Sequence, residues 1–363
     1  MNIVDGLCYD DVLLIPRNSD VKSRSDVDLS VTIKKNSNSF VFKNPVIPAN
    51  MQSIMNMQMA RQICLAGGLG IMHRFCSLKE QFEILYVLGS DISVANNIGF
   101  SIGVKEDDKN TIEQFVKLGA QILCIDIAHG DSEACINMTK WISQNYPNVL
   151  LIAGNVSTAD GAERLWIAGA DVVKVGVGPG SLCSTRIETG NGVPQLTALM
   201  DVYNRKYRLL HLKKLHENVI GAPPEVLDSI KELNKEVYII ADGGLKNSGD
   251  IVKALCFSDM VMAGNLFAGC TETPGNMFNV DGRTFKEYAG SSTHKTNHVE
   301  GVVAMVHPKG RYKDVLIKLL EGLQSGMSYQ GVHNLTDLKK DPQFVRITAA
   351  GLRESHPHDV KIL

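Results

Sequence analysis

The chain has 363 residues, 44% of them apolar, which is enough to bury one large core or two ordinary ones. Its 37 basic and 39 acidic residues give a net charge of -2, with no block of like charge that would indicate a nucleic-acid partner. The first residues, MNIVDGLCYDDVLLIP, lack the basic and apolar segments of a targeting peptide, and no later stretch approaches a membrane span. We therefore expect a cytoplasmic protein that binds neither nucleic acid nor membrane.

Short apolar runs recur along the chain, and helix-like sequence with a period of 3.6 residues lies between many of them. The runs lie at 45–50, 68–73, 97–103, 121–128, 149–155, 171–177, 237–244 and 259–265. Strand and helix alternating 8 times, with nearly continuous apolar strands, predict one α/β domain over residues 1–363, a parallel (β/α)8 TIM barrel. A doubly wound sheet is the alternative, because a miscount of one or two strands would remove the difference.

Three regions do not fit a bare barrel. Residues 203–236 lengthen the sixth crossover with a basic helical stretch, an APP break and a second short helix, and we interpret them as a surface insertion. Residues 276–300 begin as a hairpin around Asp281-Gly282 and continue into polar sequence, which predicts a flap over the barrel mouth. The tail, residues 343–363, is expected to be extended and is rich in histidine.

In a parallel barrel, the carboxyl ends of the strands carry the chemistry. Polar or glycine residues end every predicted strand: Asn50, His73, Gly103, Asp126 with His129, Asn155, the loop 178–185, residues 242–244, and Gly264 with Asn265. Any one of them has an equally good explanation as a turn or helix cap. Together they predict a polar site at the barrel mouth.

A phosphate site is the clearest chemical feature. Backbone N–H groups of GPGS at 178–181, DGG at 242–244 and AGN at 263–265, the last before a short helix, would form anion-binding nests on consecutive strands. Asp242 precedes the Gly-Gly pair, where its carboxylate could accept hydrogen bonds from a ribose diol or form a turn. The favoured ligand is therefore a nucleotide.

Cys183 lies in the same glycine-rich loop, so its sulfur would lie close to a ligand anchored there. Oriented backbone amides favour a thiolate, and the hydroxyls of Ser184 and Thr185 could hold a proton. The other cysteines form no CxxC pair and are expected to be small core residues. The sequence has no cluster with metal-ligand spacing and no GxGxxG that opens a helix, so a nicotinamide cofactor would bind without a Rossmann domain.

Several motifs resemble the inosine monophosphate dehydrogenase and guanosine monophosphate reductase family. They are LCYDDVLLIPRNSDV, IDIAHGDS, IAGNVST, KVGVGPGSLCSTR, GVPQLTA, IIADGGLKNSGDIVKAL, EGLQSGMSYQG and FVRITAAGLRESHPHDV, which span the chain from its first residues to its last. The resemblance implies a (β/α)8 barrel, usually a homotetramer. In this family, a loop cysteine forms a covalent adduct at C2 of a purine nucleoside monophosphate, and a nicotinamide dinucleotide exchanges hydride with it.

The resemblance also implies roles for individual residues. Cys183 would be the nucleophile, Thr185 the hydroxyl that handles protons, and Glu300 a catalytic carboxylate. The residues implied in substrate binding are Ser181, Gly244 and Gly264 at the phosphate, Asp242 at the ribose, Ser291 and Gly301 in the flap, and the adjoining Gly243 and Asn265. Asp126, His129 and Asn155 would lie on the cofactor side. A potassium ion would bind the main-chain carbonyls of Gly178, Gly180 and Cys183, with Glu354, Ser355 and His356 from a neighbouring subunit.

The two reactions of the family require different flaps. The dehydrogenase hydrolyses its adduct with an Arg-Tyr pair in a long flap, whereas residues 290–300 are short and contain no such pair. The sequence also lacks the regulatory CBS domain that most dehydrogenases carry after the second strand. These features favour NADPH-dependent reductive deamination of GMP to IMP.

Other features resemble dehydrogenases. They are GGLGIMH, His129, the AGLRESHPHD tail, and Asn297 where reductases have an arginine. An IMP dehydrogenase that uses NAD, with His294 or His298 replacing the missing base, is therefore the first alternative. A catalytically silent nucleotide-binding barrel is the second.

Overall fold

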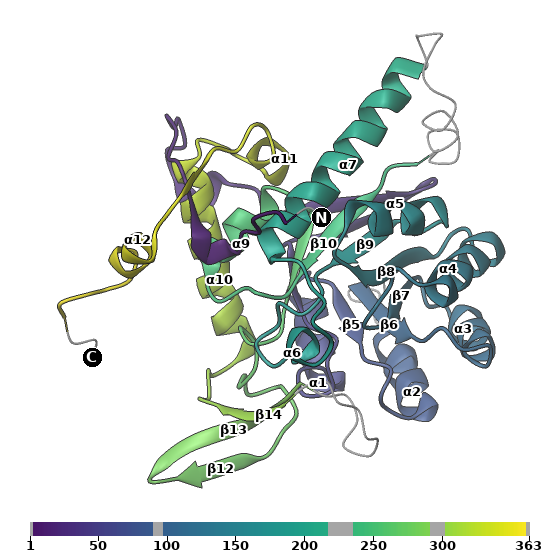
Figure 1. Cartoon of the computed structure of the whole chain (residues 1–363). Coiled ribbons are helices and arrows are strands. Elements are labelled where there is room, and N and C mark those ends of the chain that lie inside the picture. The colour runs from purple at the N-terminus through teal and green to yellow at the C-terminus, as the bar shows by residue number, and fades with distance from the viewer. Residues whose placement is uncertain (1–2, 90–96, 217–234, 291–301, 361–363) are drawn as a thin grey trace.

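A computed structural model describes residues 3–89, 97–216, 235–290 and 302–360, without the side chains of 212–216. Its centre is an 8-stranded parallel sheet with the order β4-β11-β10-β9-β8-β7-β6-β5 (Figure 1). The strands are β4 (Val46–Pro48), β5 (Gly70–Met72), β6 (Ile98–Ile102), β7 (Ile122–Asp126), β8 (Leu150–Val156), β9 (Val172–Val175), β10 (Tyr238–Asp242) and β11 (Met260–Ala263). Because β4 and β5 also contact each other, the sheet nearly closes, and the predicted TIM barrel is confirmed.

Helices surround this barrel (Figure 1). They are α1 (Met57–Leu65), α2 (Leu78–Gly89), α3 (Asp108–Lys117), α4 (Glu133–Asn145), α5 (Ala159–Ile167), α7 (Gln195–His216), α9 (Ser248–Leu255) and α10 (Tyr312–Tyr329). The side chains of Asn56, Thr158 and Asn247 cap α1, α5 and α9 by accepting backbone N–H groups. Nearly every strand residue is buried, as expected for a parallel sheet whose two faces are covered.

The polar flap begins on a small sheet outside the barrel. Strands β12 (Met277–Val280), β13 (Arg283–Ala289) and β14 (Val303–Val306) pair antiparallel. Asp281 and Gly282 have φ values of 51° and 75°, as a tight hairpin turn requires, so the predicted hairpin is confirmed. The third strand was not predicted, because it lies beyond the predicted flap. Most of the polar part of that flap, residues 291–300, lies outside the described residues.

The tail is not extended throughout, contrary to expectation. Strand β15 (Phe344–Arg346) pairs antiparallel with β1 (Val12–Leu14), and α12 (Ala349–Glu354) follows. Thr348 caps α12 by accepting the N–H of Gly351, which explains why a helix begins there. The remaining elements outside the barrel are η1 (Tyr9–Asp11), η2 (Arg24–Asp26), the hairpin β2 (Val31–Lys35) and β3 (Asn38–Phe42), and α11 (Leu335–Leu338).

The predicted insertion begins inside α7, which projects beyond the barrel on the side away from β12–β14 (Figure 1). The expected APP break and second helix lie outside the described residues. Two partly buried ion pairs hold the two ends of this segment: Lys206 Nζ lies 2.8 Å from Asp259, and Lys235 Nζ lies 2.8 Å from Asp171. Although burial raises the pKa of Asp259, the ammonium groups of Lys206 and Lys339 hold it below its ordinary value.

Most cysteines are buried, but Cys8 is exposed, so the prediction that it packs in the core is wrong. It precedes η1 at the surface, where its apolar sequence neighbours do not enclose it. Within the described residues, no helix is long and apolar enough to span a bilayer.

Candidate active site

The carboxyl ends of the barrel strands enclose a cavity of about 980 Å3. Residues at the ends of β7 to β11, the loop after β9, and Tyr288 of β13 line it together. This volume is near the upper end of the range for a site that holds one ligand, so the cavity has room for a second group beside a mononucleotide. Strands β9, β10 and β11 are neighbours, so the three predicted phosphate segments do meet in space.

Cys183 is exposed to this cavity in the loop that follows β9. Its thiol donates a hydrogen bond to Thr185 Oγ1 at 3.1 Å, and its N–H donates to Gly180 O at 3.0 Å. The loop leads directly into the short helix α6 (Thr185–Thr189), whereas no helix was expected here. The thiol and the hydroxyl are therefore within proton-transfer distance.

Arg186 forms hydrogen bonds to both ends of the loop that carries Cys183. Its guanidinium donates from Nε to Val177 O at 3.1 Å and from Nη2 to Val193 O at 2.6 Å. A Cβ on Gly178 or Gly192 would approach the Arg186 side chain to 2.5 or 2.6 Å, so both glycines leave room for it. Arg186 was not singled out from the sequence, because its partners are main-chain carbonyls that no residue pattern reveals.

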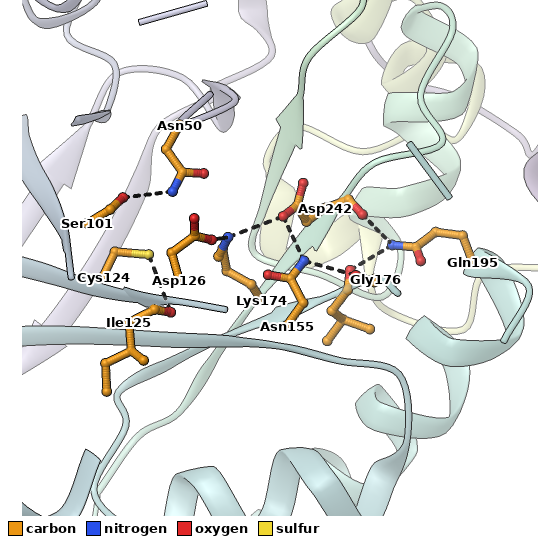
Figure 2. Close-up of polar contacts among 11 residues, drawn as sticks. Asn50, Ser101, Cys124, Ile125, Asp126, Asn155, Lys174, Gly176, Gln195 and Asp242 are labelled. Atoms are coloured by element: carbon orange, nitrogen blue, oxygen red, sulfur yellow. Dashed lines mark hydrogen bonds and ion pairs between the residues drawn. The ribbon is translucent and has the colours of Figure 1, made fainter. Parts of the chain in front are cut away.

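A buried lysine, Lys174, lies between two carboxylates of the cavity wall (Figure 2). It is 1% exposed, in the middle of β9, and its Nζ lies 2.6 Å from Asp126 Oδ1 and 3.3 Å from Asp242 Oδ2. Burial alone would lower the pKa of Lys174, but the two carboxylates raise it well above its ordinary value. Burial raises the pKa of Asp126, but the ammonium of Lys174 lowers it. The resulting pKa lies below the ordinary value for an aspartate. Lys174 was missed, although a lysine inside an apolar strand run is itself a sequence signal.

Two amide side chains join the ends of the neighbouring strands. Asn155 Nδ2 donates to Gly176 O at 2.9 Å and to Asp242 Oδ2 at 2.8 Å (Figure 2). Gln195 Nε2 donates to Val175 O at 2.7 Å and to Asp242 O at 3.3 Å. Together they tie the ends of β8, β9 and β10, so the position of the Asp242 carboxylate is set from several directions.

The two glycine turns after β10 and β11 approach other chain segments closely. Gly243 and Gly244 have φ values of 89° and 80°, in the left-handed region that favours glycine. A Cβ on Gly264 would lie 2.5 Å from the hydroxyl of Tyr288, a residue that the sequence did not single out. The expected short helix after Gly264 is only a turn, in which two N–H groups share the Gly264 carbonyl.

Most of the predicted site residues meet at the cavity. The lining includes Gly178, Gly180, Ser181, Cys183, Thr185, Asp242, Gly243, Gly244, Gly264, Asn265, Asp126 and Asn155. His129 does not line it: it is exposed on the turn after β7, where Gly130 N bonds to Asn155 O. Ser291, Glu300 and Gly301 lie outside the described residues. Among the described residues, no group of 3 or more His, Cys, Asp or Glu could hold a metal ion.

Comparison with known proteins places most of the chain in one family. Residues 6–210 and 221–358 match the family described as the IMP dehydrogenase / GMP reductase domain. The chain belongs to this family. It is therefore an oxidoreductase of purine nucleotide metabolism from a family that uses a nicotinamide cofactor.

Relatives of both kinds are similar over nearly their whole length. The chain is 33% identical over 423 residues to an inosine-5'-monophosphate dehydrogenase of Borreliella burgdorferi, covering 98% of this chain and 97% of that protein. It is 37% identical over 342 residues to a GMP reductase of Paracidovorax citrulli, covering 92% and 93%. The crystal structure of a GMP reductase from Trypanosoma brucei in complex with guanosine 5'-monophosphate superposes with a TM-score of 0.85 and 28% identity, covering 99% of each chain.

Proposed function

We propose that this family member is a GMP reductase, which converts GMP to IMP and ammonia with NADPH. The supporting observation is the length and composition of its flap. Because Ala289 of β13 pairs with Val303 of β14, the connection consists only of residues 290–302. That segment contains neither arginine nor tyrosine, so it cannot supply the Arg-Tyr pair that a dehydrogenase of this family uses to activate water.

The base of the flap is also tied to the loop that carries Cys183. Val302 N donates to Leu182 O at 3.3 Å, and Gly290 N donates to Val302 O at 2.8 Å. Hydrolysis of an adduct on Cys183 needs a general base within reach. Asp126 and Asp242, the carboxylates of the described cavity wall, are both paired with Lys174, and the lowered pKa of Asp126 makes it a weak base. Reduction of the adduct requires no such base.

The proposed reaction begins at the Cys183 thiol. Its proton passes toward Thr185, 3.1 Å away, as the sulfur forms a bond to purine C2. The bond from C2 to the amino nitrogen then breaks, and the nitrogen leaves as ammonia after taking up a proton, with Glu300 as the proposed partner of Thr185 in this transfer. A hydride then reaches C2, the S–C2 bond breaks, and the thiolate returns. The overall reaction consumes GMP, NADPH and two protons and yields IMP, NADP+ and ammonium.

We assign the two reactants to different residues of the cavity and the flap. We assign the phosphate to Ser181, Gly244 and Gly264 with the adjoining Gly243 and Asn265, the ribose to Asp242, and the purine to Ser291 and Gly301. Asp126 and Asn155 are assigned to the nicotinamide side; His129 keeps this assignment as a prediction, although it lies outside the lining. When bound, NADPH supplies the hydride.

A potassium site and a homotetramer belong to the same proposal. The carbonyl oxygens of Gly178, Gly180 and Cys183 are hard ligands of the kind that such a cation prefers. The tail residues Glu354, Ser355 and His356 are exposed, and α12 lies well away from α6 of its own chain (Figure 1). They could therefore complete the site only from a second copy of the chain.

The main alternative is an IMP dehydrogenase that uses NAD and a flap histidine. The similarity to the Borreliella burgdorferi dehydrogenase, which extends over nearly the whole length of both chains, favours this alternative. A silent nucleotide-binding barrel is less well supported, because nucleotide binding alone does not need the hydrogen-bonded pair of Cys183 and Thr185.

The test compares two reactions in potassium buffer. With GMP and NADPH, we expect loss of NADPH absorbance and equal amounts of IMP and ammonia. With IMP and NAD, we expect no NADH. NADH and XMP in the second reaction alone would instead identify a dehydrogenase. Nucleotide binding without turnover in either reaction would favour the silent barrel.

Gly264→Ala should weaken GMP binding about tenfold, because overpacking a close contact costs roughly 1–3 kcal/mol. The added methyl would lie 2.5 Å from the Tyr288 hydroxyl, and the rigid ring would have to move within the proposed phosphate site. Isothermal titration calorimetry with GMP measures the loss. Gly89→Ala is the control, because its methyl would come no closer than 3.7 Å to Leu85. Equal affinities in the two variants would show that this contact does not shape the site.

A further inference from the structure

The turn after β11 is held from outside the cavity by a lysine. Lys309 follows β14, and its ammonium donates hydrogen bonds to the carbonyl oxygen of Asn265 and, at 3.4 Å, to that of Leu266. Asn265 lines the cavity, whereas Lys309 does not. The ammonium therefore contacts main-chain atoms of the turn that forms part of the cavity wall, without lining the cavity itself.

Main-chain hydrogen bonds fix the backbone of the segment that carries the Lys309 side chain. Lys309 N donates to Gly269 O at 2.9 Å, and Thr271 N donates to Gly310 O at 2.8 Å. Gly269 has a φ of 87°, and a Cβ there would lie 2.4 Å from His307 O, so the two segments approach as closely as a backbone allows. The chain around Lys309 is thus docked against the segment that follows Asn265, and the side chain reaches back along it.

Lys309 is exposed, and it has no carboxylate partner within the described residues. By contrast, Lys174 and Lys206 each form an ion pair with a carboxylate of the barrel. Within the described residues, Lys309 forms no ion pair, and the acceptors found for its ammonium are main-chain carbonyls. In a trans peptide the C=O and N–H point in opposite directions, so the Leu266 N–H points away from an ammonium that binds Asn265 O. It also polarises that peptide.

We propose that Lys309 is a positioning residue for the 5'-phosphate of the substrate. It orients the turn at Gly264 and Asn265 and places a positive charge behind it, without touching the ligand. This inference rests on the proposed function, in which that turn binds the nucleotide phosphate.

The test compares ligands with and without a phosphate. For Lys309→Met, we expect the Kd values of GMP and ribose 5-phosphate to rise roughly three- to tenfold, as for a charge acting on a nearby helix or turn terminus. The Kd of guanosine, which lacks the phosphate, should not change. Lys309→Arg should restore most of the affinity for both phosphorylated ligands. Lys309→Gln, which keeps a hydrogen-bond donor without the charge, should behave like Lys309→Met and serves if the latter is unstable.

Two controls separate this role from a general one. Lys340→Met removes an exposed lysine that pairs with Asp337, and it should leave all three Kd values unchanged. Lys286→Met removes a buried ammonium from carbonyls of Cys270 and Thr273, farther along the same segment. Lys286→Met should lower the melting temperature without a selective loss of affinity for phosphorylated ligands.

Equal weakening of guanosine and GMP by Lys309→Met, or no change in either, would overturn the inference. The inference would also be overturned if Lys286→Met lost affinity selectively for the phosphorylated ligands, to the same extent as Lys309→Met. A wild-type protein that binds ribose 5-phosphate but neither GMP nor IMP would refute the proposed function. In that case the ribose 5-phosphate titrations would still decide the role of Lys309.

Discussion

Cys183→Ala should abolish turnover, with a loss of roughly 10^4-fold or more, as found when a nucleophile is removed from an enzyme that works through a covalent intermediate. The sulfur is exposed and its hydrogen bond is to Thr185, so its removal should leave folding and GMP binding nearly unchanged. Steady-state kinetics measure the first expectation, and thermal melting with GMP titration measures the second.

Cys8→Ala is the matched control for this experiment. Cys8 is the other exposed cysteine of the described chain, and it lies outside the cavity lining. It should keep full activity. A Cys183→Ala enzyme with more than a small fraction of wild-type activity would exclude covalent catalysis by this residue. Loss of activity in Cys8→Ala would show that the effect is not specific to the loop.

Lys174→Met should be the most destabilising of the substitutions considered, by about 3–5 kcal/mol near neutral pH, because it removes a fully buried ammonium and leaves two partly buried carboxylates without their counter-ion. Asp126 and Asp242 both face Lys174 from the cavity wall. Activity should fall as well, because both carboxylates belong to the proposed binding site. Urea denaturation at several pH values measures the loss of stability.

The pH dependence of this loss has a predicted sign. In the wild type, Lys174 holds the pKa of Asp126 below its ordinary value, so the stability from this group is present at neutral pH and is lost only as pH falls through the lowered pKa. Without the lysine, the burial that raises the pKa of Asp126 would be opposed only by Asn50 and Arg74, so we expect that pKa to lie above its ordinary value in the folded state. Lys174→Met should therefore gain stability as pH falls from about 7 to about 5, where the wild type does not.

Two further variants test the cause. Lys174→Arg keeps the charge and should lose much less stability than Lys174→Met. The double variant Lys174→Met with Asp126→Asn should recover part of the loss, because one uncompensated charge is gone. A Lys174→Met protein with wild-type stability at neutral pH would contradict the assignment of this lysine as the counter-ion.

The sequence was sufficient to predict the barrel strands, because parallel strands covered on both faces leave long apolar runs. Of the 8 strands of the sheet, 7 lie within the predicted runs, and β8 extends one residue beyond its run, to Val156. The cluster at the strand ends was predictable for a related reason, since the barrel brings its strand ends to one face. Cys183 and Asp242 therefore meet at one cavity although 59 residues (242 minus 183) separate them.

Contacts between distant side chains were not predictable in the same way. Lys174 bonds to Asp126 and Asp242, which lie 48 and 68 residues away in the sequence. Tyr288 reaches Gly264 from a strand outside the barrel, and Arg186 binds main-chain atoms. Such partners depend on how whole elements pack, which a local period of two or 3.6 residues does not encode.

The most direct test of the proposed mechanism is the intact mass of the enzyme after mixing with GMP and NADP+ and quenching in acid. NADP+ fills the cofactor site without supplying hydride. We predict a mass increase equal to GMP less one ammonia, located on the peptide that contains Cys183 and absent from Cys183→Ala. An enzyme that stays unmodified with GMP, yet gains the adduct from IMP and NAD, would contradict the reductase and identify a dehydrogenase.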